Sequence, residues 1–154
     1  MAGEKILLPF NFTVYDERAL KFVINTFPKR EDVKITLFNA YTPLPELDME
    51  ASPLLERTKE GMAALSRELT QKEGGLKSAK EFLVENGFAD DQVDYVFQKR
   101  TKPVADEIIE LAAKGRYTVL VLSRQSGKAA RMFARSVHDK VLSGLKDITI
   151  CIAT

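Results

Sequence analysis

The stretch that decides the fold is Thr118-Val119-Leu120-Val121-Leu122-Ser123, an apolar run that predicts a strand. The loop that follows, residues 124–135, carries basic side chains and no acidic one. Ser136 and Asp139 then have the spacing of a capping box, which predicts a helix whose first backbone N–H groups point into this loop. A strand end, a cationic loop and a helix N-terminus favour a site for an anion such as phosphate. A solvated basic loop without a ligand is the alternative interpretation.

Outward from this stretch, strand and helix signals alternate along the whole chain. Strands are predicted at 6–8, 33–38, 93–97, 117–122 and 148–153. Helices are predicted at 13–27, at 54–69 and 76–84 with a break or kink at Gly74-Gly75, at 104–112 and at 136–143. This order predicts a single α/β domain over residues 1–154, with a parallel sheet and helices on both of its faces.

Composition excludes several classes of protein. A chain of 154 residues suits one domain, and 45% hydrophobic with 29% charged residues is typical of an ordinary globular protein. The formal net charge of +1 argues against general attraction to nucleic acid or to a membrane surface. A single cysteine, Cys151, excludes an internal disulfide and metal sites built from cysteine pairs. Without a signal peptide or a membrane-spanning run, we expect a cytoplasmic protein.

The predicted topology indicates where a ligand would bind. In open parallel sheets, ligands lie outside the carboxyl ends of the strands, at the point where the winding direction reverses. The loops that follow strands are therefore the candidates, and two qualify best: Pro9 to Thr13, and Ser123 to Arg135.

At these two loops the chain resembles the universal stress protein family, and the resemblance extends over nearly its full length. Leu7-Leu8-Pro9-Phe10-Asn11-Phe12-Thr13 is similar to the opening strand and turn of that family. Ser123-Arg124 and the run from Ser136 to Val141 are similar to its fourth-strand exit and its last helix. The resemblance implies an open five-stranded parallel sheet in the order 3-2-1-4-5, which places the winding reversal between the first and fourth strands.

Many members of that family bind ATP through three spaced glycines followed by a hydroxyl residue. Laid on this chain, the glycine positions fall on Leu122, Gln125 and Arg135, and only the hydroxyl, Ser136, is kept. The aspartate that holds the ribose falls on Asn11, which can hydrogen-bond but carries no charge. The chain therefore resembles the branch that lacks the glycine-rich signature and acts as a stress-linked dimer. The long side chain of Arg135 would fill the space of a phosphate, although its charge could hold a smaller anion.

The candidate ligand-binding set gathers residues from the predicted strand ends and the basic loop. It consists of Pro9, Asn11, Thr13, Ala40, Ser123, Arg124, Gln125, Lys128, Arg131, Arg135 and Ser136. No catalytic residue and no metal ligand is expected. His138 has no nucleophile or second base committed to it, so we expect it at the surface. Asp106 and Glu107 are expected on a helix surface, and Cys151 is expected to be a buried apolar residue.

These observations lead to three functional hypotheses. The first is a non-enzymatic stress-response protein, a cytoplasmic homodimer with weak or no ATP binding, no required cofactor and an unidentified protein partner. The second is a switch that binds ATP or AMP through Asn11, Ser123, Ser136 and the arginines of the loop. The third is a small nucleotide-hydrolysing enzyme, for which the strand ends supply no suitable base or metal-ligand set.

The last predicted strand is a candidate dimer interface. The family order places it at a sheet edge, and after Asp147 it carries no charge. Natural proteins usually protect such an edge with lysine, proline or a short strand. We therefore expect a two-fold related copy to cover this edge. The expected interface residues are Ile148, Thr149, Ile150, Cys151 and Ile152.

Overall fold

The computed structural model describes residues 3–42, 53–123 and 137–153, with the backbone alone described for residues 53–58. Its strands form one open, fully parallel sheet in the order β3-β2-β1-β4-β5, which confirms the predicted fold class. The strands are β1 (Lys5–Pro9), β2 (Lys34–Tyr41), β3 (Val93–Lys99), β4 (Val119–Ser123) and β5 (Thr149–Ala153). Because neighbours β1 and β4 are joined to helices on opposite faces, the winding reverses between them.

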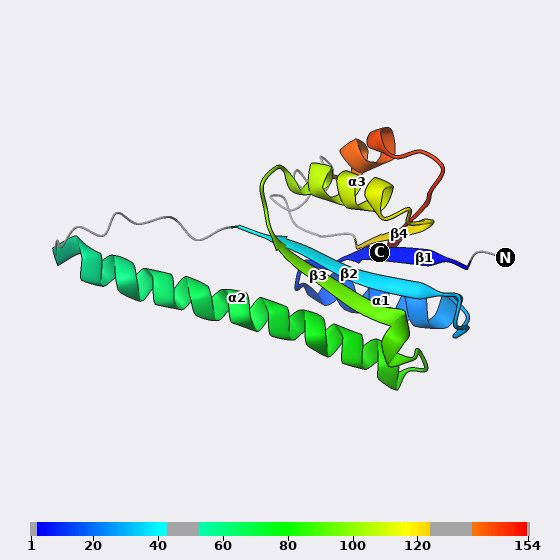
Figure 1. Cartoon of the computed structure of the whole chain (residues 1–154), viewed down its shortest axis with the longest axis horizontal. Helices are drawn as coiled ribbons and strands as arrows, with labels where there is room; N and C mark the ends of the chain where they lie inside the picture. Colours follow the sequence, from blue (N-terminus) through cyan, green and yellow to red (C-terminus); the bar gives the residue numbers. More distant parts are fainter. Residues whose placement is uncertain (1–2, 43–52, 124–136, 154) are drawn as a thin grey trace.

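Helices cover both faces of the sheet (Figure 1). On one face lie α1 (Val14–Thr26) and α2 (Pro53–Glu85), and on the other lie α3 (Val104–Lys114) and the helical residues 137–144. A short 3-10 turn, η1 (Asp90–Gln92), leads into β3. The central strand β1 is covered on both faces of the sheet. Ile6 and Leu8 point to one face and Leu7 to the other, and all three are fully buried. This explains the unbroken aliphatic runs of β1 and β4.

Two hydrophobic clusters fill the space between the sheet and its helices. The first joins Ile6, Leu8, Val23, Leu37, Leu76, Leu83 and Val121 beneath α1 and α2. The second joins Leu7, Phe38, Ile108, Ala112, Leu120, Leu122 and Val141 beneath α3 and the last helix. Alternate residues of one strand thus belong to opposite clusters, as the two-residue period of a strand requires.

The break predicted at Gly74-Gly75 is wrong, because α2 runs through both glycines as one helix of 33 residues. Gly75 instead makes room for an aromatic side chain: a Cβ atom built there would lie 2.9 Å from Cε1 of Phe12. Close packing therefore accounts for Gly75, and the helix continues despite its low propensity. The helix ends at Glu85, one residue beyond the predicted end at residue 84, and Gly87 follows with φ of +115°.

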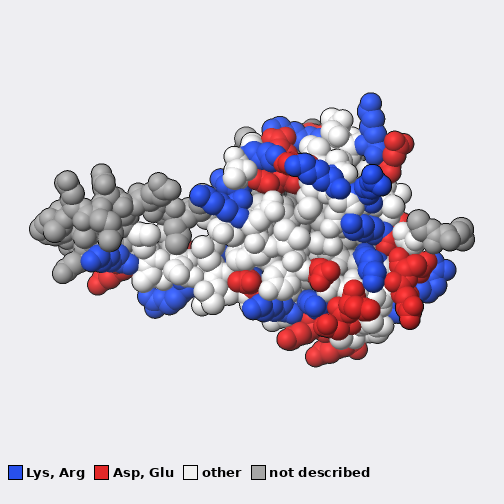
Figure 2. Space-filling model, viewed as in Figure 1, with Lys and Arg blue, Asp and Glu red and all other residues white. Residues whose placement is uncertain are grey.

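The first part of α2 extends beyond the sheet (Figure 1). Over residues 59–70 its side chains are exposed, except for Met62 and Leu69, which are half-buried. Figure 2 shows basic and acidic side chains interspersed on the face in view, in keeping with the net charge of +1. Among the helices that the structure describes, none has the length and apolar character required to cross a membrane.

Candidate functional site

A buried carboxyl group lies where β1 and β4 end, at the winding reversal. Asp16, in the first turn of α1, is 1% exposed. Its Oδ2 accepts hydrogen bonds from the backbone N–H of Thr13 at 2.7 Å and of Asn11 at 3.1 Å. Its Oδ1 accepts a hydrogen bond of 3.0 Å from the hydroxyl of Ser123, the last residue of β4. Asp16 thus joins the two loops that the sequence singles out.

The local part of this arrangement follows from the sequence. Thr13 and Asp16 have the spacing of a capping box, in which the side chain of the third helical residue accepts a hydrogen bond from the backbone N–H of the residue before the helix. The turn also places Phe12 at φ of 61°, which lets the chain bend sharply between β1 and α1. The bond to Ser123 could not have been found from local spacing, because the two residues are 107 positions apart. Local spacing therefore indicates the cap but not the bond that joins the two loops.

The surroundings of Asp16 change its acidity in opposing ways. Burial is the largest influence and raises the pKa of the carboxyl group above its usual value of 3.8. Hydrogen bonds from the backbones of Thr13 and Asn11, and from the hydroxyl of Ser123, oppose this rise by stabilising the charged form. The net direction is upward, so this carboxyl group binds its proton more tightly than an exposed aspartate does.

The end of β2 adds an amide to the same region. Asn39 donates a hydrogen bond of 2.8 Å from Nδ2 to the backbone oxygen of Phe10, which holds the β1–α1 turn against β2. Among the described residues, Oδ1 of Asn39 and Oγ1 of Thr13 are buried and have no hydrogen-bond partner. Both oxygens can accept a hydrogen bond, and buried oxygens of this kind normally have a partner.

His138 is half-buried beside Ser123 rather than on the open surface where we expected it. Burial lowers the pKa of its imidazole below the usual 6.5, which favours the neutral form. A hydrogen bond with the backbone of Ser123 and the charge of Asp139 oppose that shift. The histidine thus contacts the backbone of Ser123, while the hydroxyl of Ser123 is bonded to Asp16.

The structure brings part of the predicted ligand-binding set together. Asn11, Thr13 and Ser123 meet around Asp16, with Asn11 exposed and Ser123 buried. Pro9 is the buried last residue of β1. Ala40 packs against the hydrophobic cluster beneath α3, so it contributes to that core. Outside the described residues lie Arg124, Gln125, Lys128, Arg131, Arg135 and Ser136.

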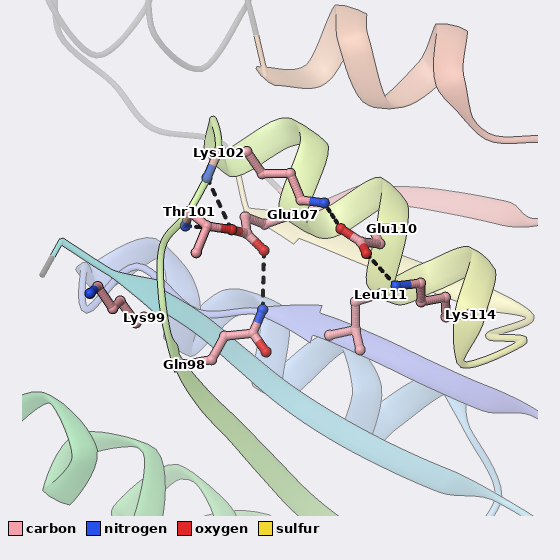
Figure 3. Close-up of a pocket in the computed structure, with 8 residues that line it drawn as sticks. All are labelled: Gln98, Lys99, Thr101, Lys102, Glu107, Glu110, Leu111 and Lys114. Carbon is pink, nitrogen blue, oxygen red and sulfur yellow. Dashed lines mark hydrogen bonds and ion pairs between the residues drawn. The ribbon is translucent and has the colours of Figure 1, made fainter.

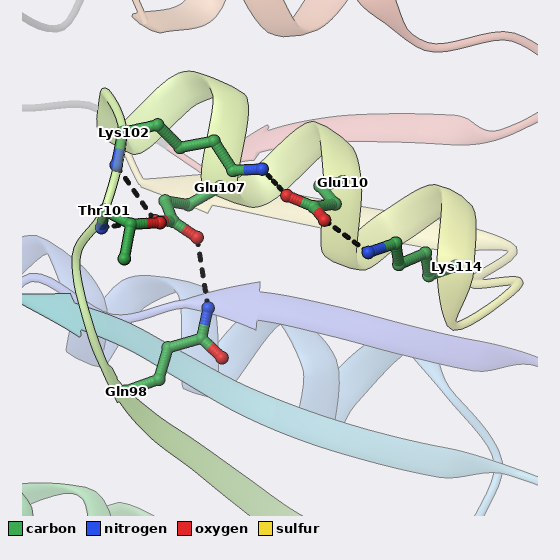
Figure 4. A network of polar contacts seen from close by, with 6 residues as sticks. All are labelled: Gln98, Thr101, Lys102, Glu107, Glu110 and Lys114. Atoms are coloured by element: carbon green, nitrogen blue, oxygen red, sulfur yellow. Dashed lines mark hydrogen bonds and ion pairs between the residues drawn. The ribbon is translucent and has the colours of Figure 1, made fainter.

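A second polar cluster lies at the end of β3, beside a pocket of about 380 Å³ (Figure 3). Glu107 of α3 accepts hydrogen bonds from Gln98 Nε2 at 3.1 Å and from the backbone N–H of Thr101 at 2.8 Å. Further bonds come from the Thr101 hydroxyl at 3.2 Å and the Lys102 N–H at 3.3 Å (Figure 4). The expectation that Glu107 lies on a helix surface is wrong, because the residue is 4% exposed.

The environment of Glu107 indicates a structural role. Burial alone would raise the pKa of this carboxyl group, but the bonds from Thr101 and Lys102 and the charge of Lys102 lower it below 4.5. Glu110 is likewise paired with both Lys102 and Lys114. The carboxyl groups at this pocket are thus engaged in holding the β3–α3 connection to its helix. Among the described residues there is also no cluster of histidine, cysteine, aspartate and glutamate that could hold a metal.

Comparisons with known proteins agree with this architecture. The sequence profile of the universal stress protein family matches residues 3–146. The fold is similar to that of universal stress protein UspA from Lactobacillus plantarum, with a TM-score of 0.66, 13% identity, and coverage of 100% of this chain and 99% of that one. It is also similar to a universal stress protein in complex with cAMP, with a TM-score of 0.62, 16% identity, and coverage of 100% and 98%.

A third similar structure is the universal stress protein from Archaeoglobus fulgidus in complex with dAMP. Its TM-score is 0.59, its identity 13%, and the alignment covers all of both chains. At these identities the likeness concerns the fold. No curated protein sequence matches the chain.

Proposed function

The chain belongs to the universal stress protein family, and we propose that it acts as a non-enzymatic stress-response protein with weak or no ATP binding. Within this proposal the protein is a cytoplasmic homodimer that needs no cofactor and acts through a protein partner. The family fold supports the stress-response role. The residues where β1 and β4 end support weak ATP binding and a non-enzymatic role, and the apolar edge strand β5 supports the homodimer.

The position of Leu122 in the core of the sheet is the observation that carries the proposal of weak ATP binding. By the resemblance to the family, the first glycine of the ATP signature falls on this residue. Leu122 lies within β4, pairs with Ile152 of β5, and is 4% exposed in the cluster beneath α3. Glycine serves phosphate loops because it lets the backbone approach the ligand closely. A core leucine inside a strand ladder does not supply that approach.

The polar groups at the winding reversal support a non-enzymatic role. Ser123 is 5% exposed, and its hydroxyl donates a hydrogen bond to Asp16. His138 interacts with the backbone of Ser123 and is not bonded to its hydroxyl. A serine nucleophile needs access to substrate, and both Ser123 and the carboxyl group that accepts its hydrogen bond are buried.

The edge strand β5 supports the proposed homodimer. Ile148 and Ile150 pack toward the cluster beneath α3, whereas Cys151 and Ala153 pack toward the one beneath α1. Cys151 is half-buried and Ile152 is 43% exposed, so apolar surface remains at this edge. Edge strands with such surface are normally covered. A second copy related by a two-fold axis would cover it symmetrically.

Calorimetric titration of the purified protein with ATP tests the proposal. We expect no saturable heat at micromolar ATP and no ATP-dependent rise in melting temperature, since a ligand that binds only the folded state must raise it. A dissociation constant in the micromolar range would contradict the proposal. Placing glycine at both Gln125 and Arg135 should strengthen ATP binding if their side chains fill the phosphate space.

A nucleotide-binding switch is the second candidate, because two similar structures are complexes with cAMP and with dAMP. Such a switch would use Asn11, Ser123, Ser136 and the arginines of the 124–135 loop in place of glycine amides. It predicts that AMP stabilises the protein, and that Arg124→Ala and Arg131→Ala each weaken AMP binding by roughly 1.5–3 kcal/mol. Stabilisation of the wild type by AMP that both variants lose would favour this candidate over the first.

A further inference from the structure

We propose that a pocket between α2 and the carboxyl ends of β2 and β3 binds the ammonium group of a small organic cation. The pocket has a volume of about 290 Å³. This is just below the range of about 300–1,000 Å³ that is typical of pockets for drug-sized ligands, so a small group is the better fit. It lies beside the edge strand β3, whereas the candidate site described above lies where β1 and β4 end (Figure 1). A ligand here would add to the proposed function and does not depend on it. The lining residues are Tyr41, Ser66, Leu69, Thr70, Glu73 and Phe97.

Two aromatic rings contribute to the lining of this pocket. Tyr41 ends β2, and Phe97 of β3 pairs with Asn39, so the two aromatic residues are diagonal neighbours on one face of the sheet. Their ring centres are 4.6 Å apart and their ring planes meet at 56°, so neither ring fully covers the face of the other. The face of an aromatic ring carries partial negative charge and attracts a cation placed over it.

Glu73 of α2 adds a carboxylate to the same pocket. Its Oε1 accepts a hydrogen bond of 3.2 Å from the hydroxyl of Tyr95, and among the described residues it forms no ion pair. Glu68, on the same helix, is paired with Lys72 at 3.2 Å. Lys77 has the helical spacing for an ion pair with Glu73 but is exposed and lines a different pocket. Carboxylates that lose contact with water are usually paired with a cation, and half-buried Glu73 has none among these residues.

The rest of the lining is compatible with a cation. Ser66 and Thr70 contribute hydroxyl groups, and that of Thr70 donates to the backbone oxygen of Ser66 at 3.1 Å, which leaves its lone pairs free to accept. Leu69 supplies apolar surface for alkyl groups. The described residues that line the pocket include no lysine or arginine. Two rings, one negative charge and no positive charge suit an alkylated ammonium group and disfavour a phosphate.

Packing of α2 against the sheet is the competing explanation. Phe97 also packs against the hydrophobic cluster beneath α1 and α2, and the bond between Tyr95 and Glu73 ties α2 to β3. That role needs an acceptor for the tyrosine hydroxyl but no negative charge, and it predicts no affinity for a ligand. The two explanations therefore differ in whether the pocket distinguishes a cation from a neutral molecule of the same shape.

Titration of the wild type with choline, and with dimethylbutanol, in which carbon replaces the charged nitrogen, tests the proposal by proton NMR. We expect the ring resonances of Tyr41 and Phe97 to shift saturably with choline. The N-methyl resonance of choline should move upfield, because ring currents shield protons held over an aromatic face. Tyr117 is the internal control, since its ring is buried elsewhere and already contacts the ammonium group of Lys5.

The affinities decide between the two explanations. Choline should bind at least about fivefold more tightly than dimethylbutanol, because only choline gains from the rings and from the carboxylate as a charge. Equal affinity for the two molecules would overturn the proposal, as would the absence of a saturable shift with choline. The wild type suffices for this test, so it does not depend on the folding of any variant.

Substitutions separate the charge from the rings. Glu73→Gln keeps an acceptor for Tyr95 and should weaken choline binding roughly 2- to 5-fold. Phe97→Leu keeps apolar bulk and should weaken it roughly 2- to 30-fold. Glu68→Gln is the matched control, because Glu68 lies on the same helix, is paired with Lys72 and does not line the pocket, so choline binding should be unchanged. Undiminished binding in both Glu73→Gln and Phe97→Leu would overturn the assignment to this pocket.

An ammonium group of this kind can belong to a free small molecule or to a methylated lysine of another protein. A short peptide that carries trimethyllysine, titrated beside choline, separates the two sources. Tighter binding of the peptide assigns the group to a protein side chain, and equal or weaker binding assigns it to a small molecule. Either result supports the site, because the recognised head group is the same. Micromolar ATP binding would contradict the proposed function and leave this site unaffected.

Discussion

The ring of Phe12 lies against the backbone of Gly75, so closely that a Cβ atom on Gly75 would come within 2.9 Å of Cε1 of the ring. Phe12 belongs to the turn between β1 and α1, and Gly75 lies in the second half of α2. The same ring meets Phe10 edge to face, with the ring centres 5.2 Å apart. The contact therefore joins α2 to the turn whose backbone N–H groups bind Asp16.

Alanine substitutions at Gly74 and Gly75 should have opposite outcomes. A Cβ atom on Gly74 would meet nothing within 4 Å, so Gly74→Ala should stabilise the protein by about 0.5–1 kcal/mol through helix propensity. Gly75→Ala gains the same propensity but must displace the ring of Phe12, so it should be neutral or destabilising. Chemical denaturation of the two variants measures the difference. Equal stabilisation by both would show that the ring moves aside freely.

Loss of the Glu107 carboxylate should destabilise the protein in a pH-dependent way. The pKa of Glu107 is lowered in the folded state, so its stabilising contribution is present above about pH 4.5 and is lost as the pH falls through the folded-state pKa. Glu107→Gln should therefore cost about 1–3 kcal/mol at pH 7 and progressively less in acid. Urea denaturation at several pH values measures this difference.

Glu110→Gln is the matched control for that prediction. Glu110 lies one turn further along α3, is partly exposed and forms ion pairs with Lys102 and Lys114. Ion pairs near the surface contribute about 0–1 kcal/mol, so its loss should be smaller than that of Glu107. A larger effect from Glu110 would contradict the structural role assigned to Glu107.

Substitutions at Tyr117 and Thr36, whose side chains share a buried hydrogen bond, should have strongly coupled effects on the free energy of unfolding. The hydroxyl of Tyr117 donates to Oγ1 of Thr36 at 2.9 Å, and both residues are buried. Tyr117→Phe leaves a buried hydroxyl without this partner and should cost about 1–3 kcal/mol. Adding Thr36→Val removes that unsatisfied group, so the double variant should be more stable than the sum of the two single losses predicts. A double-mutant cycle measures the coupling, and additive losses would contradict it.

The proposed dimer should depend on Ile152. This residue is 43% exposed on β5, so Ile152→Lys should give a folded monomer by light scattering and circular dichroism. Val14→Lys is the control, since Val14 is 76% exposed on α1 and should leave the dimer intact. Ile150→Lys is a poorer probe, because Ile150 also packs against the cluster beneath α3 and its loss would disturb the core. A wild type that stays monomeric and soluble at micromolar concentration would contradict the dimer.

Much of the candidate site could be located from the sequence, but its chemistry could not. The alternation of strands and helices places Asn11, Thr13 and Ser123 at the carboxyl ends of neighbouring strands, and the structure brings them together. Asp16 has only the local signature of a helix cap. Its bond to Ser123 depends on the pairing of β1 with β4, which no local window contains.

The sequence by itself determined the element order and the parallel sheet, because hydrophobic periodicity, capping residues and helix stops act over a few residues. Only the tertiary structure decided that α2 continues through Gly74-Gly75, that Glu107 is buried, and that Asp16 meets Ser123. Each of these places involves a partner on another element: the ring of Phe12 packs against Gly75, Gln98 bonds Glu107, and Ser123 bonds Asp16. Packing and buried hydrogen bonds between distant residues can outweigh local propensity, because they act only once the chain has folded.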